Sequence, residues 1–431
     1  MRALDDEVTR WSFYSWANHG WVGPVVTVLI GPWLLALAVE AAGSGRATLF
    51  SIGAWQVSAE AFPALTMAAA SAIQVVSLPL LGAVADTRRL RRRLLGWTCA
   101  LGSVITLMLA TTGGTAWAYA GTLFVIGNLV FGATDVVCNA FLPDLAPPEA
   151  RDQTSGRGFA LGYLGSGLIM AVNLAVLQFD AALGIDRATA VRLCFLAAGL
   201  WWAGFGWYAI RGLRDHDRGR TAVRGGLRDS LRTLRRMPHA RRYLISYLLI
   251  TDAISGVTGL ASVYLTHELF VGDAGRAAPF LFMLILAIQF VAMGGSVLWT
   301  VVAVRLGAKA TLLITLLLWC GIVIYAFWAL RELWEAIVLG VVIGIVVGGS
   351  QSLARSLYSQ MIPWGHETTF FSLYAVCDKG TAWIAPLTFS VIVSLTGSYR
   401  QAILSLIVIF VGGIVLLVCT DVRHAQSEAL R

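Results

Sequence analysis

Apolar runs of about 20 residues recur along the whole chain, separated by short segments that carry charges, glycine or proline. Because the hydrocarbon core of a bilayer is about 30 Å thick, one helical crossing needs roughly 20 apolar residues. Only 13% of the 431 residues are charged, whereas soluble domains usually carry about 25%. The sequence therefore predicts an all-α integral membrane protein.

Apolar windows and the residues that interrupt them predict twelve transmembrane helices. The first run is too long and too aromatic at its start for a cleaved secretory signal, so we interpret it as a retained helix. The expected spans lie near residues 12–39, 62–85, 94–112, 117–141, 158–179, 189–210, 243–267, 278–304, 308–330, 334–360, 369–394 and 399–420.

Arginine and lysine are concentrated on one side of these spans. The densest basic segments run from Arg88 to Arg93, after the second span, and from Arg211 to Arg242, between the sixth and seventh. Since basic loops stay on the cytoplasmic side, we expect a multi-pass protein of the cell's inner (plasma) membrane with both termini in the cytoplasm. The net charge of +8 then reflects topology, and nucleic acid is not expected as a partner.

Part of the second basic segment has helical spacing. Leu227, Leu231 and Leu234 recur among arginines, a pattern typical of an amphipathic helix on anionic headgroups. A solvated linker between two halves of the protein fits the same residues. Membrane lipids are in either case the expected surroundings of the chain.

The two halves of the chain are weakly similar. When Asn139 is aligned with Arg355, residues 131–135 fall on residues 347–351, and small or polar positions coincide. Internal similarity at half the chain length predicts a duplicated architecture. We therefore expect two pseudo-symmetric six-helix bundles, residues 1–210 and 243–431, joined by a cytoplasmic basic linker at residues 211–242.

Two parallel six-helix halves describe the major facilitator fold, in which the bundles rock about a central solute site. The loop after the second span begins G-x-x-x-D and ends with basic residues, and it resembles the signature loop of that superfamily. The resemblance implies a cytoplasmic latch, a charge network that holds one conformation. Its residues are Gly82, Asp86, Arg88 and Arg89. Arginines that only set topology are the alternative.

Several further stretches resemble the vacuole-effluxer-like branch of the superfamily, whose fungal members are associated with autophagy and with release of amino acids from the vacuole. Ser15 stands where the branch usually has aspartate, and Asp378 where it often has glycine. A coupling role of that first-helix acid is therefore lost or moved here. The matching stretches are Phe13–Asn18, Asn139–Ala146, Gly158–Gly165, Gln351–Tyr358 and Phe370–Lys379.

Ionisable residues within spans are candidates for the transport site, because a charge at the bilayer centre costs about 2.5–3.5 kcal/mol on insertion scales. Asp252 and Asp378 lie about ten residues into their spans, near mid-depth. Asp135 and Arg355 come late in theirs, where a gate or the edge of a site is expected. Lys379 adds a fixed cation. The alternative is that these charges only pair to hold helices together.

Two polar pairs have i, i+4 spacing and so share a helix face: Asp135 with Asn139, and Gln351 with Arg355. We hypothesise that the four groups meet, with Arg355 pairing with an acid when the cytoplasmic side is closed. Asp252 or Asp378 is the stronger candidate for proton coupling.

Helix 1 offers a second group of candidates. Tyr14, Trp16 and Asn18 either line the cavity or, in the case of the tryptophan, anchor the helix at the membrane interface.

A carrier of a small solute fits these features best. A fixed cation near acids suits a zwitterion, so we predict secondary active transport of amino acids or small peptides by alternating access, coupled to protons or sodium. The alternatives are a facilitated uniporter or effluxer of a sugar, drug or metabolite, a channel, or a non-transporting receptor. Motifs of membrane enzymes and of nucleotide sites are absent from the sequence, so no enzyme activity or cofactor is expected. The six cysteines stand singly, so no metal is expected. We expect the protein to be a monomer.

Overall fold

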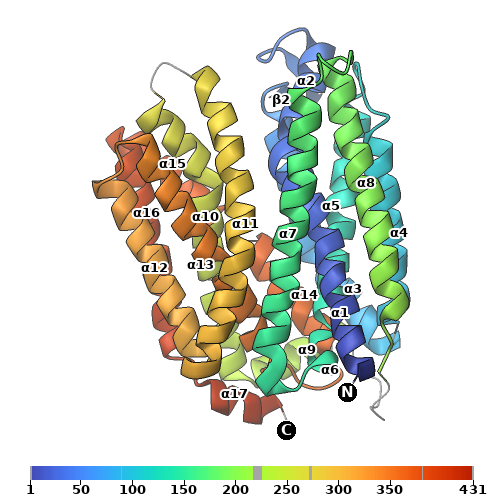
Figure 1. Cartoon of the computed structure of the whole chain (residues 1–431), viewed down its shortest axis with the longest axis vertical. Coiled ribbons are helices and arrows are strands. Elements are labelled where there is room, and N and C mark those ends of the chain that lie inside the picture. Colours follow the sequence, from blue (N-terminus) through green and yellow to red (C-terminus); the bar gives the residue numbers. More distant parts are fainter. Residues whose placement is uncertain (1, 89, 217–225, 271–273, 381, 430–431) are drawn as a thin grey trace. The chain divides into compact units, whose positions relative to one another are not determined.

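The structure, a computed structural model, describes residues 2–88, 90–216, 226–270, 274–380 and 382–429 (Figure 1). Within these residues, each of the twelve predicted segments coincides with a helix. The helices that correspond to them are α1 (Arg2–Trp21) with η1 (Val22–Leu29) and α2 (Ile30–Ala42), α3 (Phe62–Arg88), α4 (Arg91–Leu109), α5 (Trp117–Asn139), α7 (Arg151–Gln178), α8 (Arg187–Gly212), α10 (Pro238–Leu269), α11 (Ala274–Leu306), α12 (Ala308–Trp328), α13 (Leu333–Ser359), α14 (Glu367–Gly380) with α15 (Ile384–Thr396), and α16 (Tyr399–Val418).

Eleven stretches of helix are long and apolar enough to cross a membrane among the described residues. The segment predicted at 94–112 is not one of them, because α4 has only 19 residues and begins with three arginines. The first predicted span, 12–39, lies within the longer candidate span Asp5–Ala42, and its first helix, α1, begins at Arg2. The protein is nevertheless a multi-pass membrane protein with an all-α fold.

Shorter elements lie between the spans. The strands β1 (Thr48–Ile52) and β2 (Trp55–Ser58) form an antiparallel hairpin that the sequence analysis did not predict. The expected amphipathic segment is helical, as α9 (Gly226–Arg235). Its neighbours at residues 217–225 lie outside the described residues. The remaining elements are α6 (Leu142–Leu145), η2 (Pro148–Ala150) and α17 (Val422–Ala429).

The chain forms two compact units. The first comprises Met1–Ser77, Leu90–Cys138 and Leu164–Asp215. In this unit α8 packs against both α1 and α4. Aromatic rings fill its centre: Trp21 lies 5.1 Å from Phe131 and 5.7 Å from Trp202, measured between ring centroids.

The second unit comprises Leu78–Arg89, Asn139–Tyr163 and His216–Arg431. Here α11 packs along α13, while α10 packs against α14 and α16. The α11–α13 contact is close because α13 carries glycine: a Cβ at Gly348 would lie 2.4 Å from the Ala292 carbonyl oxygen. Small residues let membrane helices approach in this way.

The eleventh predicted span, 369–394, is not one continuous helix. It is divided into α14, which ends at Gly380, and α15, which begins at Ile384. Within a span, the backbone groups freed by such a break need partners other than lipid. The Asp252 side chain of α10 supplies one such partner, and this arrangement builds the candidate site.

Candidate functional site

Two adjacent residues near the middle of α10 hold the two sides of the break between α14 and α15. Asp252 is 1% exposed, and its Oδ2 accepts the backbone N–H of Ala385 at 2.8 Å. The residue at the N-cap position of α15 is Trp383, whose indole cannot accept a hydrogen bond. Asp252 therefore caps α15 from another helix, and its negative charge faces the positive end of the helix dipole.

Thr251 contacts the other side of the break. Its hydroxyl donates to Oδ1 of Asp378 at 2.7 Å, and Nζ of Lys379 lies 3.2 Å from Oδ2 of the same carboxylate. The side chains of Asp378 and Lys379 are 35% and 21% exposed. Three of the predicted site residues, Asp252, Asp378 and Lys379, thus lie at the facing ends of α14 and α15. They supply two carboxylates and one ammonium group.

Four stacked tyrosines of the second unit run from this region along α10, α13 and α14. Tyr247 stacks on Tyr374 with ring centroids 3.8 Å apart, and Tyr374 stacks on Tyr358 at 5.1 Å. Tyr358 in turn lies 5.9 Å from Tyr243. The sequence analysis missed these residues, as it missed Thr251. The spacing of Tyr243 and Tyr247, four residues apart on one helix face, was the available signal.

Arg355 lies near the C-terminal end of α13 and is 4% exposed. Its Nη1 donates to Oδ1 of Asn139 at 3.0 Å, and its other nitrogens donate to the hydroxyl and the carbonyl oxygen of Ser155, both at 2.9 Å. The guanidinium also lies 4.2 Å above the ring centre of Phe159, an attractive cation–π geometry. The predicted meeting of Asn139 with Arg355 is present.

The neighbours of Arg355 on α13 also contact α7. Gln351 accepts a hydrogen bond from the Tyr163 hydroxyl at 2.6 Å, and the Ser356 hydroxyl donates to Asp152. Ser155, Phe159 and Tyr163 were not predicted as site residues, although the last two lie in the matching stretch Gly158–Gly165. Their spacing along one face of a helix was the signal that pointed to a shared partner.

Two of the predicted latch residues, Gly82 and Asp86 near the end of α3, contact the start of α14. The Asp86 carboxylate, 6% exposed, accepts the backbone N–H groups of Thr368 at 2.9 Å and Thr369 at 2.7 Å. It also accepts the Thr369 hydroxyl at 2.8 Å. A Cβ at Gly82 would lie 2.8 Å from the Thr368 carbonyl oxygen. Asp86 therefore caps α14 as Asp252 caps α15.

The basic part of the predicted latch falls on Arg89 and the side chain of Arg88, which lie outside the described residues. Among the described residues, the signature loop contacts α14 through its glycine and its aspartate.

The helix 1 candidates belong to the first unit. Tyr14 is fully buried, and Asn18 is 3% exposed and accepts a hydrogen bond from the Thr134 hydroxyl at 3.2 Å. Trp16 stacks on Trp201 with centroids 5.4 Å apart. Asp135 also lies in this unit, whereas Asn139 belongs to the second. The side chains of Tyr14, Trp16 and Asn18 therefore pack inside the helical bundle of the first unit.

Comparison with known proteins identifies the family. Residues 5–430 match the family described as vacuole effluxer Atg22 like. The chain belongs to this family. The Uncharacterized MFS-type transporter YxiO of Bacillus subtilis (strain 168) is 25% identical to this chain over 99% of both chains. Autophagy-related protein 22-1 of Phaeosphaeria nodorum is 27% identical, over 86% of this chain and 78% of that protein.

Solved structures place the Atg22-like chain in the major facilitator fold. The transporter FucP in its outward conformation has a TM-score of 0.68 at 14% identity and covers 96% of this chain and 98% of its own. The human organic anion transporter MFSD10 has a TM-score of 0.66 at 18% identity, with 96% and 99% covered. The chain is therefore an MFS-type membrane transporter, as the resemblance implied.

Proposed function

We propose that this transporter moves a small zwitterionic solute, an amino acid or a small peptide, by ion-coupled alternating access. The observation that carries the proposal is the capping of α15 by Asp252, a buried carboxylate near the middle of a predicted span. Oδ1 of this carboxylate has no hydrogen-bond partner among the residues that the structure describes. Ionisable side chains within a membrane span are energetically costly, and they usually mark a substrate or ion pathway.

The charges at the break suit both ends of a zwitterion. An ammonium group is attracted by the Asp378 carboxylate, and a carboxylate group is attracted by Lys379 and by the N-terminal N–H groups of α15. When Asp252 is ionised it occupies that helix end itself. Protonation weakens its hold, because the neutral acid is a poorer acceptor, and leaves the helix end to a solute carboxylate. Proton and solute binding would in this way be coupled.

The remaining features complete the proposal. The Arg355 contacts between α13, α5 and α7 and the Asp86 cap on α14 form the gate at the cytoplasmic side, with both termini in the cytoplasm and the protein in the plasma membrane. The family description, vacuole effluxer Atg22 like, favours export as the direction. The pseudo-symmetric bundles at 1–210 and 243–431 supply the rocking motion.

Proteoliposomes provide the test. Purified protein is reconstituted with an imposed pH gradient, and uptake of radiolabelled amino acids and dipeptides is measured for the wild type, Asp252→Asn and the exposed control Asp6→Asn. We expect saturable flux that the pH gradient drives in the wild type and the control. Asp252→Asn should retain exchange of solute yet lose the response to pH, because the amide still caps α15 but cannot be ionised.

The outcomes separate the alternatives. If the pH gradient drives flux of sugars or drugs but not of amino acids or peptides, the proposed solute class is wrong. Saturable flux that does not depend on proton or sodium gradients indicates a uniporter. Ion conductance indicates a channel, and solute binding without flux indicates a receptor. Proton-coupled flux that is unchanged in Asp252→Asn contradicts the assigned role of Asp252.

A further inference from the structure

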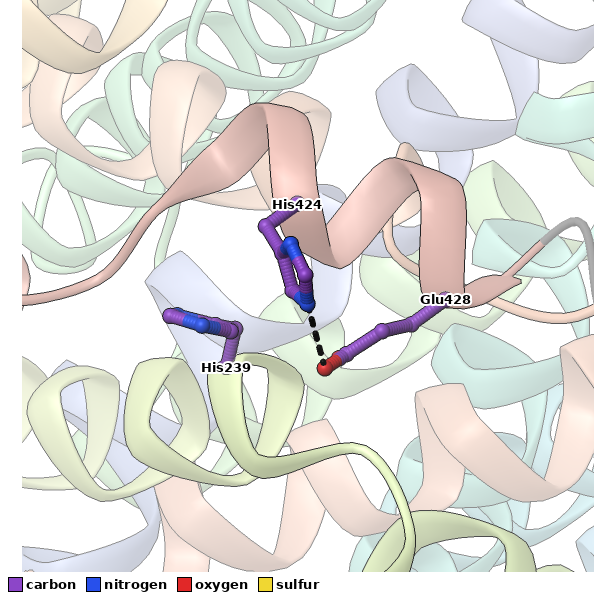
Figure 2. Close-up of side chains that lie close together, drawn as sticks. All are labelled: His239, His424 and Glu428. Atoms are coloured by element: carbon purple, nitrogen blue, oxygen red, sulfur yellow. Dashed lines mark ion pairs between the residues drawn. The ribbon is translucent and has the colours of Figure 1, made fainter.

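Two histidines and a glutamate meet where the C-terminal helix α17 contacts the start of α10 (Figure 2). His239 lies in the first turn of α10, and His424 and Glu428 lie one turn apart on α17. One nitrogen or oxygen atom from each residue lies within 4.8 Å of the corresponding atoms of the other two. His424 Nε2 and Glu428 Oε1 are 3.6 Å apart.

We propose that these three residues form a binding site for a divalent transition metal, with Zn²⁺ as the best match. Zinc is bound by imidazole and carboxylate at about 2.0–2.1 Å, so two ligand atoms on one tetrahedral ion lie roughly 3.4 Å apart. The His424–Glu428 separation is already close to this value. Three protein ligands of the His₂Glu type leave a fourth position for water.

The burial of Glu428 supports the site independently. Its side chain is 10% exposed, and its Oε2 is buried without a hydrogen-bond partner among the described residues. A buried carboxylate oxygen without a partner is unfavourable, and a bound cation removes that penalty. The His424 side chain is 53% exposed, so the metal can reach the site from solvent.

The base of α17 is held in place by Asp421 before any metal binds. The backbone N–H of Asp421 donates to Nδ1 of His239 at 3.1 Å, and its Oδ1 accepts the backbone N–H of His424 at 3.0 Å. The contact at the His424 N–H fixes the start of α17. The contact at His239 uses the lone pair of that ring, so a metal bound by His239 displaces the Asp421 N–H.

A metal at this point would tie α17 to the first helix of the second half of the chain. Arg423 and Gln426 of α17 also form part of the wall of a cavity of about 870 Å³, which residues of α7 and α12 line as well. Docking of α17, and with it the shape of this cavity, would then depend on metal. The arginine distribution assigns this end of the molecule to the cytoplasm, so the site would respond to the intracellular metal supply.

Metal titration of the full-length protein in detergent tests the proposal. The protein carries an affinity tag without histidine and is stripped with EDTA, and Zn²⁺ and the spectroscopic probe Co²⁺ are then added. We expect one Zn²⁺ per chain, visible Co²⁺ absorption bands typical of low coordination number, and a higher melting temperature with Zn²⁺. His424→Gln and Glu428→Gln should each weaken binding by at least about tenfold.

His267→Gln is the matched control, because His267 lies in the same unit but stacks on Tyr399 away from the cluster. It should bind Zn²⁺ as the wild type does. Melting temperatures measured in EDTA separate misfolded variants from those that have lost only the ligand. Equal Zn²⁺ affinity of the wild type, His424→Gln and Glu428→Gln overturns the proposal, as does a wild type that binds no Zn²⁺. Neither result bears on the transport proposal.

Discussion

Arg355 donates a hydrogen bond to Asn139 at 3.0 Å, and these are the two residues that the internal repeat superimposes. Two residues that occupy the same position in two repeats can touch only near the axis that relates the repeats. The same rule holds for the contact across a symmetric dimer interface. The contact thus links the weak duplication in the sequence to the gate proposed at Arg355.

Removing this arginine should weaken both the fold and the transport cycle. Hydrogen bonds to charged groups contribute about 1.5–3 kcal/mol, so a double-mutant cycle of Arg355→Ala and Asn139→Ala should give a coupling free energy of that size. Chemical unfolding in detergent measures it. Arg355→Lys should rescue little, because an ammonium does not reproduce the planar set of donors. Normal transport by well-expressed Arg355→Ala would remove Arg355 from the gate.

Asp86→Ala should destabilise α14. The substitution removes three accepted hydrogen bonds and leaves the N–H groups of Thr368 and Thr369 buried. Loss of a cap costs about 0.5–2 kcal/mol, and buried unpaired donors add to it, so we expect a loss of about 2–3 kcal/mol in the free energy of unfolding. Asp86→Asn keeps one acceptor and should lose less. Equal losses for the two variants would show that capping is not the function of Asp86.

Gly82→Ala should also lower stability, for a steric reason. The added Cβ would lie 2.8 Å from the Thr368 carbonyl oxygen and 2.9 Å from the Ser372 hydroxyl, so α3 and α14 must separate. Overpacking of this kind costs about 1–3 kcal/mol. Gly31→Ala is the control, because a Cβ there meets no atom within 4 Å. Melting temperatures of the two variants should therefore differ clearly; similar values would contradict the close approach.

Acidification should destabilise the contact between α9 and α14 through His366. Its Nδ1 lies 2.8 Å from the Ser230 hydroxyl. Burial lowers the pKa of this imidazole from its ordinary value of 6.5, although the nearby carboxylates of Asp86, Glu367 and Asp229 act in the opposite direction. The unfolded chain then binds the proton more readily than the folded protein does, so stability falls as the pH drops below about 6.5.

The measurement is the melting temperature between pH 7.5 and 5. His366→Gln should flatten the pH dependence over this range, because it removes the titrating group while keeping a hydrogen-bonding side chain. A variant with the same pH profile as the wild type would assign the acid sensitivity to other groups.

The order of the helices was predictable from the sequence because lipid imposes a simple rule. Each crossing requires a continuous apolar run, and the positions of such runs can be found without tertiary information. The signature loop at Gly82 and Asp86 was likewise predictable, since glycine and an acid at a fixed spacing are local features. The eleventh span was confirmed as the candidate crossing Glu367–Thr396, whereas its division into α14 and α15 was not predicted, because the apolar run continues past the break.

The sequence by itself determined a helical membrane protein, its family and the ionisable residues that lie within its spans. Only the tertiary structure decided the partners of those residues: that Asp252 caps α15, that Arg355 bonds Asn139, and that His239 meets His424 and Glu428. The physical reason is that hydrophobic length and helix periodicity act along the chain, whereas a hydrogen bond or a set of metal ligands joins atoms whose separation in space is fixed by packing.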